Sequence, residues 1–509
     1  MVVRAAVEHF DVLIMGAGLS GIDAAYHLQK LCPKKSYVIL EQRDRIGGTW
    51  DLFRYPGIRS DSDMLTMGYS FRPWTSEKAI SPGGDIREYI SATAREAGID
   101  RHIRFRHRIC RAAWSSDEAK WTVEAVQVSP SGREEAVTLS CNFLFSCAGY
   151  YRYSAGYTPE FPGLERFAGR VVHPQAWPED LDYAARRVVL IGSGATAVTL
   201  LPAMARTAQH VTMLQRSPTY VFSLPEQDAI ANRLRRVLPA MWAYRLSRWK
   251  NILFTMYVYH LARRYPEFAK KGIAKQVREQ LGADFDVDTH FTPRYNPWEQ
   301  RLCIAPDGDF FQAIRSGRAS VVTGRIAKFT ENGILLESGQ EVEADIVVTA
   351  TGLVLQALGG AELAVDGRRV ELRDALAYKG VMISGVPNLA SVFGYINASW
   401  TLKADLICGY VCRLLNYMDR KGVRQVTPKP VDETATAHFV EHFTPGYIQR
   451  ALESWPKQGG KSPWRVYQNY IRDMISLKWS RIDDGALEFS NAAQVLRAGA
   501  AALHAGQQL

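Results

Sequence analysis

The chain contains one short pattern twice, and this repetition limits the folds that are open to it. An apolar run over 11–15 ends at a glycine-rich turn, Gly16 to Gly21, and a helical pattern follows. About 175 residues later, a run over 187–191 ends at a similar turn, Gly192 to Ala197, before a second helical pattern. A strand, a glycine-rich turn and a helix in this order are typical of dinucleotide-binding domains. The sequence therefore predicts an α/β protein with two doubly wound domains.

The glycines of the first turn have separate physical roles. Gly16 permits a tight turn, Gly18 lets a pyrophosphate approach the backbone, and Gly21 lets the helix and the strand pack closely. The N-terminus of the helix then faces the anion. Glu41 follows a second apolar run over 37–40, where a carboxylate would bind a ribose hydroxyl. These features predict a nucleotide site.

The second turn differs from the first at the end of its second strand. An acidic residue is expected there, but the chain has Gln215, Arg216 and Ser217. A carboxylate would repel a 2′-phosphate, whereas an arginine can pair with it, so the second site favours NADPH over NADH. The alternative is that Arg216 only ends the strand at the surface. Two nucleotide sites in one chain suggest a flavin enzyme that a nicotinamide reduces.

Two further apolar runs suggest how the domains are connected. The runs over 142–149 and 345–352 both end in small residues. We interpret them as the exit from the first domain and the return to it, so that the second domain is inserted into the first. The predicted FAD-binding domain covers 1–150 and 345–509, with the C-terminal region. The predicted NADPH-binding domain covers 151–344 and carries a helical lobe at about 225–290.

Composition excludes several other classes of protein. The chain has 47% apolar and 22% charged residues, as a folded protein does, and 509 residues exceed one ordinary core. Its net charge of +10 is spread without a dense basic run, which argues against nucleic-acid binding. The seven cysteines form no C-x-x-C pair, so we expect no metal and no disulfide-reductase centre. We find neither a signal peptide nor a membrane span and predict a cytoplasmic protein.

A longer motif lies just before the second turn. Phe167, Gly169, His173, Trp177 and Pro178 form the pattern FxGxxxHxxxWP. This pattern resembles the signature of type I Baeyer–Villiger monooxygenases, whereas related flavin monooxygenases usually carry Tyr-Lys or Tyr-Arg in place of Trp-Pro. The segments 47–63, 295–303 and 397–405 are similar to those of the ethionamide-activating monooxygenase group. The resemblance covers the chain from about Asp11 to Asp484.

The resemblance implies an activity and its catalytic residues. The enzyme would use FAD, NADPH and O2 to convert a ketone to an ester or lactone through a flavin C4a-peroxide. Arg301 would be the catalytic arginine and Asp61 its partner. A fixed cation favours the peroxyanion and stabilises the oxyanion that forms at the carbonyl. His173 would link the domains rather than donate a proton. Many relatives have Lys immediately before the catalytic arginine, but this chain has Gln300, which places more of the NADPH preference on Arg216.

The same resemblance implies the cofactor contacts. The expected FAD contacts are Gly16, Gly18, Ser20, Gly21, Glu41, Thr49, Trp50, Asp51, Leu52, Asp61 and Ile109. The expected NADPH contacts are Arg59, Ser60, Asp61, Gly192, Ser193, Gly194, Ala195, Thr196, Ala197, Val198, Arg216 and Ser217.

Two alternative functions use the same features. A flavin monooxygenase that acts mainly on sulfur or nitrogen would need the same cofactors, and we expect oxidation of thioethers and thioamides as a side activity. A flavin-binding scaffold or sensor without enzyme activity would not need Arg301 and Asp61. No local motif indicates the natural ketone or the oligomeric state.

The segment from Arg233 to Arg264 mixes aromatic and basic residues. Such a mixture favours a membrane interface, where rings lie at headgroup depth and cations meet anionic lipid. The alternative is a helical lobe whose aromatic side chains pack inward while its arginines face water. The sequence leaves both interpretations open, and the first would place the protein at the inner face of the cell membrane.

Overall fold

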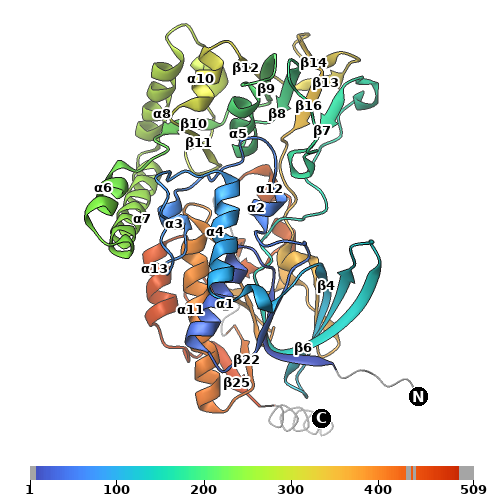
Figure 1. Cartoon of the computed structure of the whole chain (residues 1–509), viewed down its shortest axis with the longest axis vertical. Helices are drawn as coiled ribbons and strands as arrows, with labels where there is room; N and C mark the ends of the chain where they lie inside the picture. Colours follow the sequence, from blue (N-terminus) through green and yellow to red (C-terminus); the bar gives the residue numbers. More distant parts are fainter. Residues whose placement is uncertain (1–6, 431–436, 439–442, 492–509) are drawn as a thin grey trace.

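The computed structural model describes residues 7–430, 437–438 and 443–491, and Figure 1 shows their arrangement. The first sheet is built on β1 (Glu8–Met15), which lies between the parallel strands β2 (Tyr37–Leu40) and β6 (Glu134–Ser146). Helix α1 (Leu19–Leu31) connects β1 to β2. The strand order β18-β17-β4-β5-β6-β1-β2-β3 places the first glycine-rich turn at the carboxyl end of a central strand.

Both faces of the first sheet are covered, as its uninterrupted apolar strands predict. Along β1, Val12 and Ile14 face a core that contains α1 and the long helix α11 (Trp400–Lys421). Leu13 and Met15 face a second core, which lies under the antiparallel strands β4 (His107–Ser115) and β5 (Lys120–Val128). Alternate residues of a strand point to opposite faces, so one short run contributes to two cores.

The second sheet is entirely parallel and lies at the top of Figure 1. Its strand order is β12-β9-β8-β16-β7, and helix α5 (Ala195–Met204) follows β8. The bounds of its strands are β7 (Arg170–Val172), β8 (Arg187–Ile191), β9 (His210–Gln215), β12 (Ala319–Thr323) and β16 (Ile346–Thr349). The predicted fold class, an α/β chain with two doubly wound units, is confirmed.

The sequence predicts that the run over 345–352 already belongs to the first unit. This prediction is wrong, because the run still forms a strand of the second sheet, and the return begins after it. Val347 of β16 pairs with Val189 of β8 and with Val171 of β7, so this run is an interior strand of the second sheet, between β8 and β7. The exit strand is where the sequence predicts it, because β6 pairs with β1. Buried parallel strands in either sheet have the same apolar composition, and the sequence pattern cannot distinguish them.

A helical lobe projects from one side of the molecule, at the left of Figure 1. It consists of α6 (Ala229–Val237), α7 (Ala240–Arg264), α8 (Pro266–Leu281) and α9 (Val287–Phe291), as the predicted lobe at about 225–290 requires. Pro239 separates α6 from α7. Among the described residues, no helix combines the length and apolarity that a membrane span would need.

Shorter elements complete the fold. The other helices are α2 (Thr49–Leu52), α3 (Met64–Met67), α4 (Gly83–Glu96), α10 (Asp309–Arg315), α12 (Gly446–Gln449) and α13 (Tyr470–Met474). The other strands are β3 (Ile103–Arg104), β10 (Tyr220–Leu224), β11 (Leu302–Pro306), β13 (Ile326–Phe329), β14 (Gly333–Leu336), β15 (Glu341–Glu343), β17 (Glu362–Val365), β18 (Arg368–Arg369), β19 (Ala377–Tyr378), β20 (Met382–Ile383), β21 (Leu389–Ser391), β22 (Gln425–Pro428), β23 (Ala437–His438), β24 (Lys457–Gln458) and β25 (Leu487–Ser490).

Candidate active site

A cavity of about 1460 Å³ is lined by residues of both glycine-rich turns and of the helical lobe. The predicted FAD contacts on its wall are Gly16, Gly18, Ser20, Glu41, Thr49, Trp50, Asp61 and Ile109. The predicted NADPH contacts on its wall are Arg59, Ser60, Asp61, Gly194, Ala195 and Thr196, and Arg301 also lines it. The predicted contacts that do not line it are Gly21, Asp51, Leu52, Gly192, Ser193, Ala197, Val198, Arg216 and Ser217.

The first glycine-rich turn has the geometry that its sequence predicts. Gly16 has a φ of +96°, a conformation that residues with a Cβ rarely adopt. A Cβ on Gly21 would lie 1.9 Å from the carbonyl oxygen of Gly16, so helix and strand approach too closely for a side chain. Gly21 therefore lies behind the cavity wall, where it lets helix and strand pack closely. Gly18 occupies the position directly before α1 and lines the wall itself.

Glu41 lies at the end of β2 and is buried on the cavity wall. Its Oε2 accepts a hydrogen bond from the backbone N–H of Ala17 at 2.7 Å, and its Oε1 accepts one from the backbone N–H of Arg43 at 2.8 Å. Burial raises the pKa of this carboxyl, although both hydrogen bonds oppose the shift. The carboxylate thus ties the second strand to the turn at which a nucleotide would bind.

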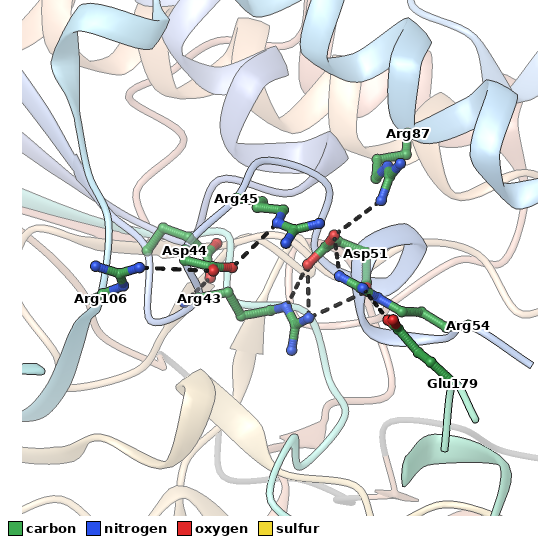
Figure 2. A network of polar contacts seen from close by, with 9 residues as sticks. Arg43, Asp44, Arg45, Asp51, Arg54, Arg87, Arg106 and Glu179 are labelled. Carbon is green, nitrogen blue, oxygen red and sulfur yellow. Dashed lines mark hydrogen bonds and ion pairs between the residues drawn. The ribbon is translucent and has the colours of Figure 1, made fainter. Parts of the chain in front are cut away.

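Asp51 is fully buried, and three arginines surround it (Figure 2). Arg43 lies 2.7 Å from its carboxylate, Arg54 3.2 Å and Arg87 3.4 Å. Burial alone would raise the pKa of Asp51, but the hydrogen bond from Arg43 and the three positive charges together lower it. Arg54 also pairs with Glu179, next to the Trp177-Pro178 dipeptide, at 2.7 Å. The structure therefore places Asp51 in an ion-pair network behind the cavity, and Leu52 packs in the core of the second unit.

Arg301 is held on the cavity wall by three side chains from distant parts of the chain. Its Nη1 lies 3.4 Å from the Asp61 carboxylate, and its Nε donates to the hydroxyl of Tyr447 at 3.2 Å. Its guanidinium also lies 5.8 Å from the ring centre of Phe443. Tyr447 and Asp61 raise the pKa of Arg301 further, so the group is a permanent cation. The predicted pair of Arg301 and Asp61 is together in space.

Tyr447 and Phe443 are site residues that the sequence prediction missed. Phe443 lies just before the short helix α12 and Tyr447 lies within it, and both are more than a hundred residues after Arg301. No motif marks them, and a single aromatic residue in a loop is not by itself a functional signal. They come close to the arginine only because the chain, after β16, returns to the first unit and folds back toward the cavity.

The second glycine-rich turn is as tight as the first. A Cβ on Gly192 would lie 2.3 Å from the carbonyl oxygen of Ala350. Arg59, an expected NADPH contact, forms an ion pair with Asp309 of α10. Arg216 follows β9, is exposed, and forms no ion pair with any residue in the described part of the chain. Its guanidinium is therefore available to an anion beside the turn.

His173 contacts backbone and does not line the cavity. Its Nδ1 accepts a hydrogen bond from the N–H of Gln175 at 3.1 Å, so Nε2 carries the proton and donates to the carbonyl of Gly352 at 3.2 Å. Burial lowers the pKa of the imidazole, which keeps it neutral. Gly352 follows β16, where the chain leaves the second unit, and this contact agrees with the predicted linking role.

The rest of the signature also supports the linker. A Cβ on Gly169 would lie 2.4 Å from the carbonyl oxygen of Asp345, directly before β16. Phe167 is buried against the small sheet that contains Phe329, and Trp177 packs against the core of the second unit. These three residues therefore pack within the second unit, beside the strand from which the chain returns to the first.

The ends of α1 and α5 fit the phosphates of two nucleotides. A glycine, Gly18 or Gly194, directly precedes each helix, no side chain caps its N–H groups, and its first turn has no acidic residue. Uncapped N–H groups and the helix dipole form a site for an anion. The residues present therefore fit one dinucleotide at each turn.

Comparison with known proteins identifies the family. The family model for flavin-binding monooxygenase-like proteins matches residues 9–381. The chain belongs to the flavin-binding monooxygenase-like family. Among curated members, it is 53% identical over 485 residues to the FAD-containing monooxygenase EthA of Mycolicibacterium smegmatis, covering 95% of this chain and 97% of that protein. The probable FAD-binding monooxygenase AlmA of Acinetobacter baylyi is 48% identical, with 95% and 96% covered.

Solved structures of this flavin-binding monooxygenase fold are similar along nearly the whole chain. A steroid monooxygenase bound to NADP has a TM-score of 0.73 at 20% identity, covering 95% of this chain and 100% of that one. Cyclohexanone monooxygenase from Rhodococcus sp. Phi1, bound to NADP+, has a TM-score of 0.70 at 20% identity, with 96% and 100% covered. The resemblance to the ethionamide-activating group of flavin monooxygenases is confirmed by the curated relatives.

Proposed function

We propose that this flavin monooxygenase uses FAD, NADPH and O2 to insert an oxygen atom beside a ketone carbonyl, which gives an ester or a lactone. The observation that carries the proposal is Arg301, a permanent cation on the wall of a cavity shared by both glycine-rich turns. FAD would lie along Gly16 to Gly21, Glu41 and Thr49, and NADPH along Gly194 to Thr196. When bound, NADPH supplies a hydride and FAD supplies the chemistry that activates oxygen.

The side chains around Arg301 suit a reaction in which negative charge develops on a carbonyl oxygen. An arginine keeps its charge throughout the pH range of the protein, and Asp61 fixes one end of the guanidinium. Tyr447 fixes Nε, so Arg301 needs little reorganisation when the charge appears. Overall, the carbonyl carbon bonds to one oxygen atom of O2, and a carbon substituent migrates from that carbon to the new oxygen. The O–O bond breaks, and the second oxygen atom leaves as water, reduced by the two electrons that NADPH supplies.

The domain assignment is part of this proposal. The unit around the first sheet would bind FAD, and the unit from 151 to the end of β16 would bind NADPH. We further propose a cytoplasmic enzyme whose helical lobe makes a peripheral contact with the inner face of the membrane. Oxidation of thioethers and thioamides is expected as a side activity, because the same oxygen donor reacts with soft nucleophiles.

A substrate panel tests the proposed reaction. Aliphatic ketones, aryl ketones and thioethers are each mixed with the holoenzyme, NADPH and O2. The measurement combines NADPH consumption with identification of the product. We expect esters from ketones at higher kcat/KM than sulfoxides from thioethers. Sulfoxides without any ester would instead support the alternative, a monooxygenase of sulfur or nitrogen.

Replacing Arg216 with alanine tests the nicotinamide site. Because a hydrogen bond to a charged group is worth about 1.5–3 kcal/mol, Arg216→Ala should raise the KM for NADPH about tenfold or more. The KM for NADH should hardly change, since NADH has no 2′-phosphate. The measurement is steady-state kinetics with both nucleotides. Equal losses with both would mean that Arg216 does not bind the 2′-phosphate.

A further inference from the structure

Helix α7 exposes a continuous stripe of large apolar side chains. The stripe consists of Trp242, Leu246, Trp249, Leu253 and Tyr257, spaced three or four residues apart, and the side chains of Trp242 and Tyr257 are 60% and 64% exposed. This spacing places all five on one face of the helix. A surface helix in water normally turns polar residues outward, so an apolar stripe of this length indicates a binding surface.

The opposite face of α7 is firmly anchored. Arg248 is buried, and its Nη1 donates to the carbonyls of Leu65, Thr66 and Gly68 at 3.0, 2.9 and 2.7 Å. The hydroxyl of Tyr244 donates to the carbonyl of Tyr69 at 3.0 Å. These bonds fix the rotation of α7, and so they fix which side chains face outward. The inward packing that the sequence left open holds for Tyr244 but not for the stripe.

Positive charge surrounds the stripe. From Ala229 to Arg264 the chain has eight basic residues and no acidic one. Four of the eight are exposed and pair with no carboxylate among the described residues: Arg233, Arg236, Arg245 and Arg264. An apolar face with unpaired cations beside it is complementary to an anionic lipid surface. Two copies of the chain would instead bring the same cations against each other, since a two-fold contact repeats one patch on both sides.

The cavity of the active site opens between the helices of the same lobe. Ile230 of α6, Phe254 of α7 and Phe268 of α8 line the cavity and are 57%, 62% and 69% exposed. Because these apolar side chains line the cavity and are more than half exposed, solvent reaches the cavity beside them, and we infer that its mouth lies there. An apolar mouth is costly to leave in water, whereas in a lipid layer it would be covered.

We propose that the face of α6, α7 and α8 docks on an anionic lipid bilayer and that a long-chain ketone dissolved in the lipid passes directly into the cavity. The entry of a ketone into the cavity rests on the proposed function. The docking on the bilayer rests only on the surface of the helical lobe. The stripe lies in the interface, the arginines contact lipid phosphates, and the mouth between Phe254 and Phe268 faces the acyl chains.

Vesicle binding tests the docking without any turnover. The holoenzyme is sedimented with phosphatidylglycerol-containing vesicles or with pure phosphatidylcholine vesicles, at low and moderate salt. The wild type should pellet with the anionic vesicles, and less so at higher salt. Leu253→Ser should lower the partition coefficient roughly tenfold, because a buried leucine contributes about 1.5–3 kcal/mol. Arg233→Gln/Arg236→Gln should lower it by roughly fivefold per arginine at low salt.

Leu31→Ser is the matched control, because Leu31 of α1 is as exposed as Leu253 but lies outside the lobe. It should leave vesicle binding unchanged. A wild type that stays in the supernatant with anionic vesicles, or equal losses in both leucine variants, overturns the docking. So does a wild-type dimer in sedimentation velocity that Leu253→Ser converts to a monomer, since the stripe would then bind a second copy.

Turnover separates the docking from the proposed reaction. Leu253 does not line the cavity, so Leu253→Ser should oxidise a short water-soluble ketone at the wild-type rate. With a long-chain ketone in anionic vesicles, its rate should fall about tenfold. Equal rates for the two proteins on the vesicle substrate contradict passage from the lipid. If neither ketone is oxidised by the wild type, the proposed function fails, and vesicle binding still decides the docking.

Discussion

An Arg301→Ala variant should bind FAD and be reduced by NADPH but form almost no ester. The first half of this expectation follows from the positions of the glycine-rich turns, which the substitution does not touch. The second half follows from the loss of the fixed cation, since removal of one such group costs roughly 10²–10³-fold in kcat. Rapid-mixing spectroscopy measures flavin reduction, and product analysis measures the ester. Ester formation near the wild-type rate would show that Arg301 is not catalytic.

Two neighbours of Arg301 provide a graded comparison. Tyr447→Phe removes one hydrogen bond from Nε and keeps the ring, and a hydrogen bond to a charged group contributes about 1.5–3 kcal/mol. Because Asp61 still holds the guanidinium, we expect the lower end of this range, a fall in kcat of about tenfold, with flavin reduction unchanged. Asp61→Ala should weaken ester formation more and also slow flavin reduction, because Asp61 lies among the predicted contacts of both cofactors. An Arg301→Ala protein no slower than Tyr447→Phe would contradict this order.

A Lys403→Met variant should lose about 3–5 kcal/mol of unfolding free energy, the usual cost of leaving one member of a buried ion pair alone. Lys403 of α11 and Asp473 of α13 are both buried, and their charged atoms are 2.7 Å apart. The hydroxyl of Tyr395 donates to the same carboxylate at 2.7 Å. Burial lowers the pKa of Lys403 and raises that of Asp473, so each charge depends on the other. Denaturant unfolding of the holoenzyme measures the loss.

The double variant Lys403→Met/Asp473→Leu is the control for this prediction. It replaces both charges with apolar groups of similar size, which is often close to neutral for a buried pair. It should therefore recover most of the stability that Lys403→Met loses. A double variant as unstable as the single one would mean that packing of the lysine side chain, rather than its charge, holds α11 to α13.

The sequence by itself predicted those parts of the protein that depend on local patterns. A glycine with positive φ at Gly16 and a strand with continuous apolar residues follow from a few neighbouring positions, and so both nucleotide turns could be located. The FxGxxxHxxxWP signature is equally local, and the resemblance of the contiguous segment 295–303 to the family pointed to Arg301, whose catalytic role is proposed here. The fold class and the flavin monooxygenase family followed from these features.

The tertiary structure decided what depends on distant contacts. Pairing with β8 assigned β16 to the second sheet, and the approach of α12 brought Tyr447 to Arg301. Asp51 has the sequence context of a cofactor contact, yet burial beside three arginines makes it part of an ion-pair network. The rotation of α7 was set by Arg248, which bonds to carbonyls some 180 residues earlier in the chain. Partners this far apart leave no pattern in the sequence, because burial and pairing depend on the arrangement of the whole chain.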